Sequence, residues 1–329
     1  MRNIVIKYLF SYMKVKEKQE SLNFTRLMIY IYIMSFLLVI PVQAQNDVLL
    51  TQQWLSRINQ NPAATGNSDN IDIFILARQQ WAGFEDAPST QVLNIHNYFH
   101  RIRSGLGLSA ILDETGVGNR MVNAKLAYAY HVNIGDKFLL SLGLSGGIIQ
   151  HSFDPNRHFF VDITDPSLAT LEKTNQFSPD FDFGIELSSQ RFLFGASVTH
   201  IARLPDDATS LKIAQQYYGY VNYKQPVGSS FDLIAGIRGT NFDEAYFLDF
   251  SLTSLLLKKY WLGVMFRPDN AVAGMAGFQL GFIRLGYSYD YSIGKTASLA
   301  KNSHEILLSF KIGKPKKAIN TKSPRFIEE

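Results

Sequence analysis

Two short patterns in the chain match the spacing of catalytic motifs, but neither has the structural setting that its chemistry requires. Residues 143–147 read Gly-Leu-Ser-Gly-Gly and match the G-x-S-x-G pattern of a nucleophile elbow. That elbow needs a sharp turn between a strand and a helix, whereas Ser145 lies in an alternating run with no helical pattern after it. Residues 293–296 end in Gly-Lys-Thr like a phosphate-binding loop, without the leading part of that motif. The two patterns therefore predict no catalytic residue.

The histidines form no metal-binding pattern that we recognise. His304 and Glu305 lack the second histidine of the H-E-x-x-H zinc motif. His96 and His100 would share one face of an extended strand, but they are spaced too widely to clip a metal easily. The chain contains no cysteine, which excludes thiolate metal sites, a disulfide framework and a lipid-modified cysteine. We expect no metal, no cofactor and no enzymatic activity.

Strands are the elements predicted to position the polar residues of this chain. In 282–292 the odd positions are apolar or aromatic, while the even positions include Arg284, Ser288 and Asp290. Successive side chains of a strand point to opposite faces, so this segment has one apolar and one polar face. About fourteen such runs follow one another, at 71–81, 88–99, 104–112, 120–132, 137–150, 180–188, 191–200, 213–225, 229–239, 245–254, 259–267, 270–279, 282–292 and 303–311.

Alternation also occurs in soluble β-sandwiches, so the choice of a membrane barrel depends on further features. The runs are about ten residues long, the length that a tilted strand needs to cross a bilayer. Aromatic pairs gather near strand ends, as expected for residues at a membrane interface; they are Tyr98-Phe99, Phe159-Phe160, Tyr217-Tyr218 and Tyr260-Trp261. In lipid only a closed barrel satisfies the backbone groups of every strand. We therefore predict an all-β, antiparallel, transmembrane β-barrel of the outer membrane, with the soluble sandwich as the alternative.

The first 44 residues are typical of a cleavable signal peptide. A basic stretch ends at Arg26, an uncharged apolar run covers 27–40, and Val42-Gln43-Ala44 forms a small-residue exit. The apolar run is short for a membrane helix, which needs about 20 residues, although a membrane anchor is the alternative interpretation. Translation could also begin at Met13 or Met28.

The charge of the chain is concentrated at its two ends. Of 32 basic and 28 acidic residues, six and two lie in 1–44, and another six and two lie in 311–329. The remaining stretch 45–310 keeps 20 basic and 24 acidic residues, which argues against a nucleic-acid partner. We predict four parts: a signal peptide at 1–44, a periplasmic or plug-like segment at 45–70, the barrel at 71–311 with a long extracellular loop at 151–179, and a basic tail at 312–329.

Four motif blocks follow one another along the chain. The first is the Asn-Pro-Ala segment and the second an R-x-Q-W-x-G-F-x-x-A-P-x-T-Q pattern; glycine-rich and Tyr-Ala-Tyr strands follow, and G-Y-S-Y-D with His-Glu closes the series. In this order the blocks resemble the PorP/SprF family of the type IX secretion system of Bacteroidota, over about 47–310, with Ala64 and Asp86 as departures from the usual pattern. The residues that carry it, and that we take as candidates for partner docking, are Asn61, Pro62, Gly66, Arg78, Gln80, Trp81, Gly83, Phe84, Pro88, Thr90, Gln91, Tyr287, Tyr289, Asp290, His304 and Glu305.

The resemblance implies a non-enzymatic outer-membrane protein. Its expected partners are outer-membrane lipid, other secretion-system components in the periplasm and outer membrane, and a large secreted surface protein of the adhesin or gliding type. The alternative function is a passive channel or a transporter of hydrophobic solutes. The tail at 312–329 is expected to lie in the periplasm and contact an acidic partner, or else to be a solvated tail without a partner.

Residues alone leave two interpretations of the second block. Trp81 and Phe84 flank Gly83 near a turn, where they would serve either as structural anchors or as a docking surface for a secretion partner. Arg78 is expected to pair with the acidic turn formed by Glu85 and Asp86. Asp290 and Arg284, on the polar face of one strand, are expected to face the lumen in a structural charge network.

Overall fold

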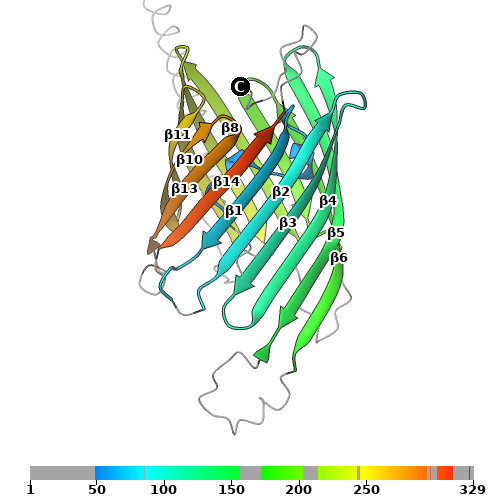
Figure 1. Ribbon diagram of the computed structural model, residues 1–329, viewed down its shortest axis with the longest axis vertical. Helices are drawn as coiled ribbons and strands as arrows, with labels where there is room; N and C mark the ends of the chain where they lie inside the picture. Colours follow the sequence, from blue (N-terminus) through cyan, green and yellow to red (C-terminus); the bar gives the residue numbers. More distant parts are fainter. Residues whose placement is uncertain are drawn as a thin grey trace, which may run out of the picture. The chain divides into compact units, whose positions relative to one another are not determined.

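The computed structural model describes residues 49–84, 86–155, 172–202, 214–242, 245–294, 297, 302–313 and 326. The chain divides into two units, 1–44 and 45–329, and all the described residues belong to the second. In this part of the chain fourteen strands form a closed barrel, in which neighbours in sequence pair and β1 (Ile71–Gln79) pairs with β14 (Ser303–Ile312) (Figure 1). The predicted barrel is confirmed, whereas the expected signal peptide lies outside the described residues.

The remaining strands agree with the predicted runs to within a few residues, apart from β6. They are β2 (Ser89–Phe99), β3 (Ser104–Thr115), β4 (Asn119–Ile134), β5 (Phe138–Phe153), β6 (Thr174–Ser188), β7 (Phe192–Thr199), β8 (Gln216–Val227), β9 (Phe231–Phe242), β10 (Ala245–Leu256), β11 (Tyr260–Arg267), β12 (Ala271–Leu280) and β13 (Ile283–Ser292). The long connection between β5 and β6 is 154–173, shorter than the expected 151–179. Pro179 belongs to β6, faces outward and pairs with Ile148 of β5.

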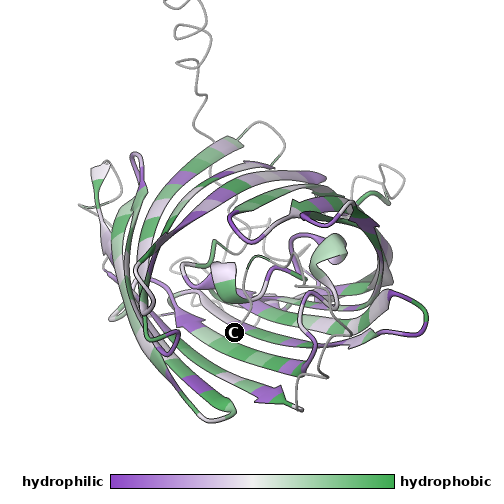
Figure 2. Ribbon diagram, turned by 90° about the horizontal axis from the view of Figure 1, so that it is seen from above, coloured by the Kyte–Doolittle hydropathy of each residue, from purple (hydrophilic) through white to green (hydrophobic). Residues whose placement is uncertain are grey.

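The alternation in sequence sorts side chains between lipid and lumen as predicted. In β13 the odd positions from Leu285 to Tyr291 are exposed on the outer face, whereas Arg284, Ser288 and Asp290 are buried inside. Figure 2 shows hydrophobic and hydrophilic residues alternating along many of the strands. Of the aromatic pairs, Tyr217 and Tyr260 face outward while their neighbours Tyr218 and Trp261 are buried; residues 159–160 lie outside the described ranges.

The two ends of the barrel differ in the length of their connections. Turns of two to four residues join strands at one end, at 100–103, 135–137, 189–191, 228–230, 257–259 and 281–282. The opposite end carries the longer connections 80–88, 154–173, 200–215 and 293–302. Outer-membrane barrels have short turns on the periplasmic side and long loops outside. We therefore assign the short-turn end, where β1 begins and β14 ends, to the periplasm.

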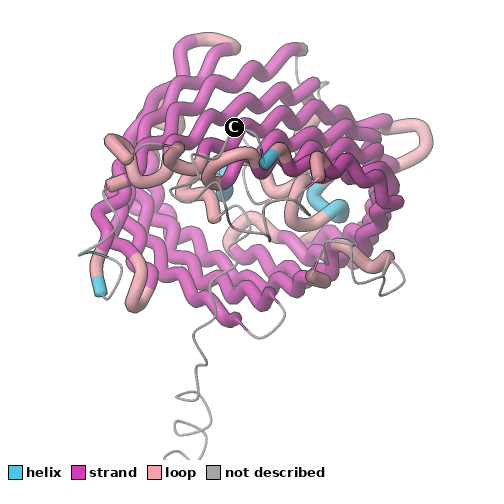
Figure 3. Tube along the Cα trace, turned by 90° about the horizontal axis from the view of Figure 1, so that it is seen from below, coloured by secondary structure: helices cyan, strands magenta, loops and turns pink. Residues whose placement is uncertain are grey.

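Residues 49–70, which we call the lumenal segment, lie inside the ring of strands. The segment contains two single-turn 3-10 helices, η1 (Gln53–Leu55) and η2 (Pro62–Ala64), visible within the ring in Figure 3. Most of its residues are buried, and its Leu50 packs with Phe74 and Leu76 of β1. The described residues include no helix long and apolar enough to cross a membrane.

Candidate functional site

The lumenal segment runs from the extracellular end of the barrel to its periplasmic end. Leu49 packs against Tyr218 near the start of β8 and Phe242 at the end of β9, both at the extracellular side. At the other end of the segment, Gly66 lies against Gly105 near the periplasmic start of β3. The segment thus crosses the lumen once before β1 begins, and its contacts with the wall define the candidate site.

A network of charges joins the segment to the strands where the barrel closes, a region we call the seam wall (β1, β13 and β14). The Arg78 guanidinium donates to the carboxylates of Asp290 and Glu305, at 2.7 Å each. Glu305 also accepts from the backbone N–H of Thr51 at 2.7 Å and of Gln52 at 3.1 Å. Its side chain is completely buried, so these donors replace the water that a carboxylate would otherwise require.

The seam network brings together residues from two of the four motif blocks. Arg78 comes from the second block, and Asp290 and Glu305 come from the last. This arrangement corrects our expectation that Arg78 pairs with the turn at 85–86. The physical reason is the strand alternation, since Arg78 points into the lumen, where the carboxylates of the neighbouring strands also point. Thr51 completes the network by donating its hydroxyl to Asp290 at 2.8 Å.

We call the strands on the opposite side of the lumen, β6 to β11, the far wall. An arginine of the lumenal segment binds the segment to this wall. Arg57 makes a bidentate contact with Glu186 of β6, with N···O distances of 3.1 and 3.2 Å. Tyr220 of β8 donates its hydroxyl to the same carboxylate at 2.6 Å, and its ring lies 5.9 Å from the Arg57 guanidinium. All three side chains are buried, and their polar groups are paired with one another.

A second far-wall cluster centres on Asp249 of β10. Arg267 donates to its carboxylate at 2.6 Å and Arg238 at 3.0 Å. Arg238 also reaches the segment, where it donates to the side-chain oxygen of Gln53 at 2.9 Å and the backbone oxygen of Leu50 at 3.1 Å. The segment is therefore tied to the wall on both sides of the barrel.

The Asn-Pro-Ala motif anchors the middle of the segment. The Asn61 side chain caps η2 by accepting from the N–H of Ala63 at 2.9 Å, and its amide donates to the carbonyl of Ile185 at 3.1 Å and to Tyr220 at 3.0 Å. Pro62 occupies the first turn of η2, where a backbone N–H would have no acceptor within the helix. The missing N–H of proline therefore costs no hydrogen bond there. A Cβ on Gly143 of β5 would lie 2.1 Å from the backbone nitrogen of Ala63, so the wall must be glycine there.

One further cluster has the residue types of a metal site, but a lysine already pairs with its carboxylates. Asp180, Asp182 and His200 lie close enough together to share an ion. The Lys125 ammonium lies 2.6 Å from Asp180 and 2.9 Å from Asp182. Lys125 already pairs with both carboxylates, so the arrangement favours a structural ion-pair cluster.

The other residues of the second block lie at the extracellular end, outside the lumen network. Gln80, Trp81, Gly83, Phe84 and Pro88 belong to the connection between β1 and β2. The N–H of Gln80 donates to the carbonyl of Pro88 at 2.9 Å, and that of Trp81 to the Ser303 hydroxyl at 3.3 Å. Phe84 is 52% exposed, so this loop presents an aromatic side chain to the exterior.

The remaining motif residues are divided between the two faces of the wall. Thr90 is buried and donates its hydroxyl to Asp113 of β3, whereas Gln91 points outward. Tyr287 and Tyr289 are exposed on the outer face, where the Tyr287 hydroxyl lies 2.7 Å from Nδ1 of His304. These outer residues do not join the lumenal cluster.

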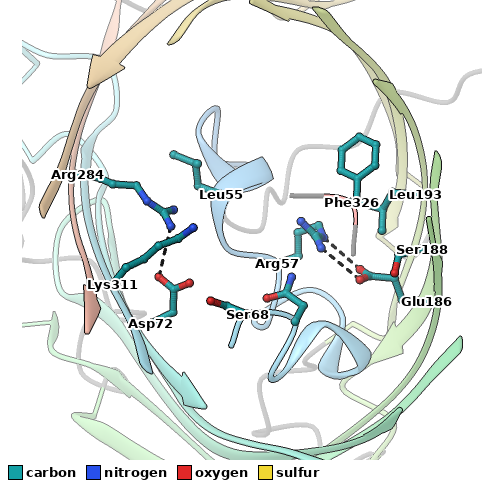
Figure 4. Close-up of a pocket in the computed structure, with 11 residues that line it drawn as sticks. Leu55, Arg57, Ser68, Asp72, Glu186, Ser188, Leu193, Arg284, Lys311 and Phe326 are labelled. Atoms are coloured by element: carbon teal, nitrogen blue, oxygen red, sulfur yellow. Dashed lines mark hydrogen bonds and ion pairs between the residues drawn. The ribbon is translucent and has the colours of Figure 1, made fainter. Parts of the chain in front are cut away.

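The periplasmic mouth of the lumen contains a small recess beside the segment. Figure 4 shows Arg57 and Glu186 on one side of it, and Asp72, Arg284 and Lys311 on the other. Arg284 lies 3.8 Å from Asp72, so it faces the lumen as predicted but pairs at the opposite end of the barrel from Asp290.

Motif-based analysis missed the far-wall residues Arg57, Glu186, Arg238, Asp249 and Arg267, and the Lys125 cluster. One signal was present in β6, where Asp180, Asp182 and Glu186 occupy alternate positions between aromatic and apolar residues. Charges repeated at period two on an otherwise apolar strand indicate a lumen that contains partners for them. Their partners could not be named, because they come from distant strands.

The fold and site together define a transmembrane barrel whose lumen is occupied by the chain's own N-terminal segment. Residues 42–310 match the family described as Type IX secretion system membrane protein PorP/SprF, and the chain belongs to that family. No curated protein matches the chain. The resemblance of the motif blocks is thereby confirmed, and the protein is an outer-membrane component of the type IX secretion system.

Solved outer-membrane barrels have a similar fold at very low sequence identity. The CymD monoaromatic hydrocarbon channel is 11% identical, with 83% of this chain and 96% of that chain covered and a TM-score of 0.50. The Ralstonia pickettii toluene transporter TbuX is 10% identical over 78% and 93% of the two chains, with a TM-score of 0.48. The Acinetobacter baumannii protein Omp33 is 8% identical over 74% and 99%, with a TM-score of 0.44. These likenesses concern the fold alone.

Proposed function

We propose that this protein is a non-enzymatic scaffold whose closed barrel assists the secretion or surface attachment of a large cell-surface protein of the adhesin or gliding type. The observation that carries the proposal is the lumenal segment, which is tied to the seam wall through Glu305 and to the far wall through Glu186. A barrel filled in this way offers its surfaces and loops to partners and leaves no role for a wide aqueous pore.

The connection between β1 and β2 is the proposed docking surface for a secretion partner or the secreted protein. Its backbone is fixed at both ends, by the Gln80–Pro88 hydrogen bond and by contacts of Trp81 and Ala82 with 302–303. A loop that is held at its ends and displays Phe84 has the character of an interaction hot spot, in which an aromatic side chain is buried by a partner. The basic tail at 312–329 is the proposed contact for an acidic periplasmic component.

The loop is tested by replacing Phe84 with serine in the full-length protein. We expect the Phe84→Ser barrel to fold normally but to lose co-purification of its secretion partners from detergent-solubilised outer membrane, together with surface display of the secreted protein. Phe282→Ser is the matched control, because Phe282 is similarly exposed, at 56%, in a turn at the opposite end. Equal secretion and co-purification in both variants would remove the loop from the proposal.

Electrical conductance separates the scaffold from the alternative of a passive channel. Purified wild-type protein in planar bilayers is expected to show little or no steady conductance, since the segment fills the lumen. A deletion of 49–66 should open ohmic pores, because the wall alone has a polar interior. Stable large pores in the wild-type protein would overturn the scaffold and favour the channel.

A further inference from the structure

The last residues of the chain include an aromatic side chain that is buried inside the barrel. Phe326 is 4% exposed and packs with Leu193, Tyr220 and Ile234 of the far wall. Trp54 of the lumenal segment packs against the same cluster. Phe326 is therefore seated between the wall and the segment, as Figure 4 shows for its position beside Leu193.

Lys224 contacts both the backbone and the ring of Phe326. The Lys224 ammonium donates a hydrogen bond to the backbone carbonyl of Phe326. It also lies 5.3 Å from the centre of the Phe326 ring, within the range of a cation–π contact. A contact to the main chain together with one to the side chain is characteristic of a peptide-binding seat, since it recognises both the backbone and the residue type.

The seat lies at the periplasmic mouth of the lumen. Leu193 is the second residue of β7, Lys224 is close to the end of β8, and Ile234 is near the start of β9, all at the short-turn end. Leu193 and Phe326 also line the recess that contains Arg57 and Lys311. β14 ends at the same side, so Gly313 and Phe326 lie at the same end of the barrel.

We propose that the C-terminal residues of this chain dock in cis into the periplasmic mouth of its own barrel, with Phe326 as the anchor and Lys224 as the clamp. In this position Phe326 packs against Trp54 and supports the lumenal segment from the periplasmic side. Gly313 and Phe326 are the fixed points on either side of 314–325, a stretch with five basic and no acidic residues.

Photocrosslinking tests the seat in the full-length protein in its membrane. Phe326 is replaced by p-benzoyl-phenylalanine, which keeps an aromatic side chain at that position, and the crosslinked peptides are mapped by mass spectrometry. We expect intramolecular links to the strands that carry Leu193, Tyr220 or Ile234, or to the segment near Trp54. The same probe at Phe282, an exposed periplasmic turn residue, should give no such links. Links from position 326 only to other proteins or lipid, or none at all, would overturn the proposal.

Limited proteolysis gives an independent measurement that does not depend on a probe. Trypsin cuts after the basic residues of 314–325, and a docked tail should be cut slowly in purified full-length protein. Phe326→Ala should raise the cleavage rate about tenfold or more, because truncation of a buried aromatic removes most of its burial; Phe326→Tyr should largely restore protection. Phe282→Ala is the control and should leave the rate unchanged. Equal cleavage of wild-type and Phe326→Ala protein would contradict docking.

Discussion

The seam wall and the far wall hold the same segment with similar chemistry, yet only one of them carries the family motifs. Glu305 of the seam and Glu186 of the far wall are both almost completely buried, and each accepts from an arginine and from a further donor. Arg78, Asp290 and Glu305 all belong to motif blocks, whereas Arg57, Glu186 and Asp249 do not. Lumenal charges outside the motifs are therefore as buried and as well paired as those inside the motifs.

The seam differs from the far wall because its strands are far apart in the sequence. β1 and β14 come from opposite ends of the barrel sequence, and their pairing closes the sheet. Such long-range pairing forms against a large loss of chain entropy. A network that joins β1, β13, β14 and the segment stabilises this step, and the far wall, built from strands adjacent in sequence, has no equivalent requirement.

The largest expected effect comes from removing the central carboxylate of the seam. Glu305→Ala should destabilise the folded barrel by roughly 3–5 kcal/mol, because Arg78 and two backbone N–H groups lose their buried acceptor. Urea unfolding in lipid vesicles, followed by the change in electrophoretic mobility between folded and unfolded barrel, measures this. Glu114→Ala is the control, since its exposed pair with Arg120 at 3.6 Å should contribute under about 1 kcal/mol. A Glu305→Ala barrel as stable as the control would show that the seam network is dispensable.

A double-mutant cycle at Arg57 and Glu186 asks whether the far wall is energetically equal to the seam. Arg57→Met and Glu186→Gln should each destabilise the barrel, and the coupling between them should be about 1–3 kcal/mol. The same cycle with Arg78→Met and Glu305→Gln provides the comparison in the same unfolding assay. Similar coupling energies on both walls would support the view that motif residues do not contribute more to stability than other lumenal charges. A coupling energy found only at the seam would contradict that view.

A smaller effect is expected where a motif residue meets a wall residue outside the motifs. Gly143→Ala places a methyl group against the backbone of Ala63 and should displace η2, at a cost of about 1–3 kcal/mol. Gly146→Ala in the same strand is the matched control, because its added Cβ would meet only the Phe181 side chain at 3.4 Å. Unfolding in urea measures the stability of the barrel, and conductance in planar bilayers measures whether the lumenal segment is displaced. Identical behaviour of the two variants would mean that the segment is not packed against β5.

Much of the fold followed from local pattern. The two-residue period in 282–292 placed Arg284 and Asp290 inside the barrel, and the structure agrees. The approximate number of strands and most of their bounds also followed, because turns interrupt the alternation at regular intervals. β6 was the exception, where its first half, 174–179, was assigned to a loop on account of Pro179. An outward-facing proline in a barrel strand is compatible with pairing, and the sequence carries no mark that distinguishes it from a loop proline.

Pairing between distant residues was decided only by the tertiary structure. The amino-acid sequence by itself determined which face of each strand is polar, because a strand's geometry fixes side-chain direction residue by residue. It did not determine that Arg78 joins Asp290 and Glu305, that Arg57 joins Glu186, or that Phe326 enters the lumen. Those contacts depend on closure of the barrel around the segment, which brings together residues separated by more than a hundred positions.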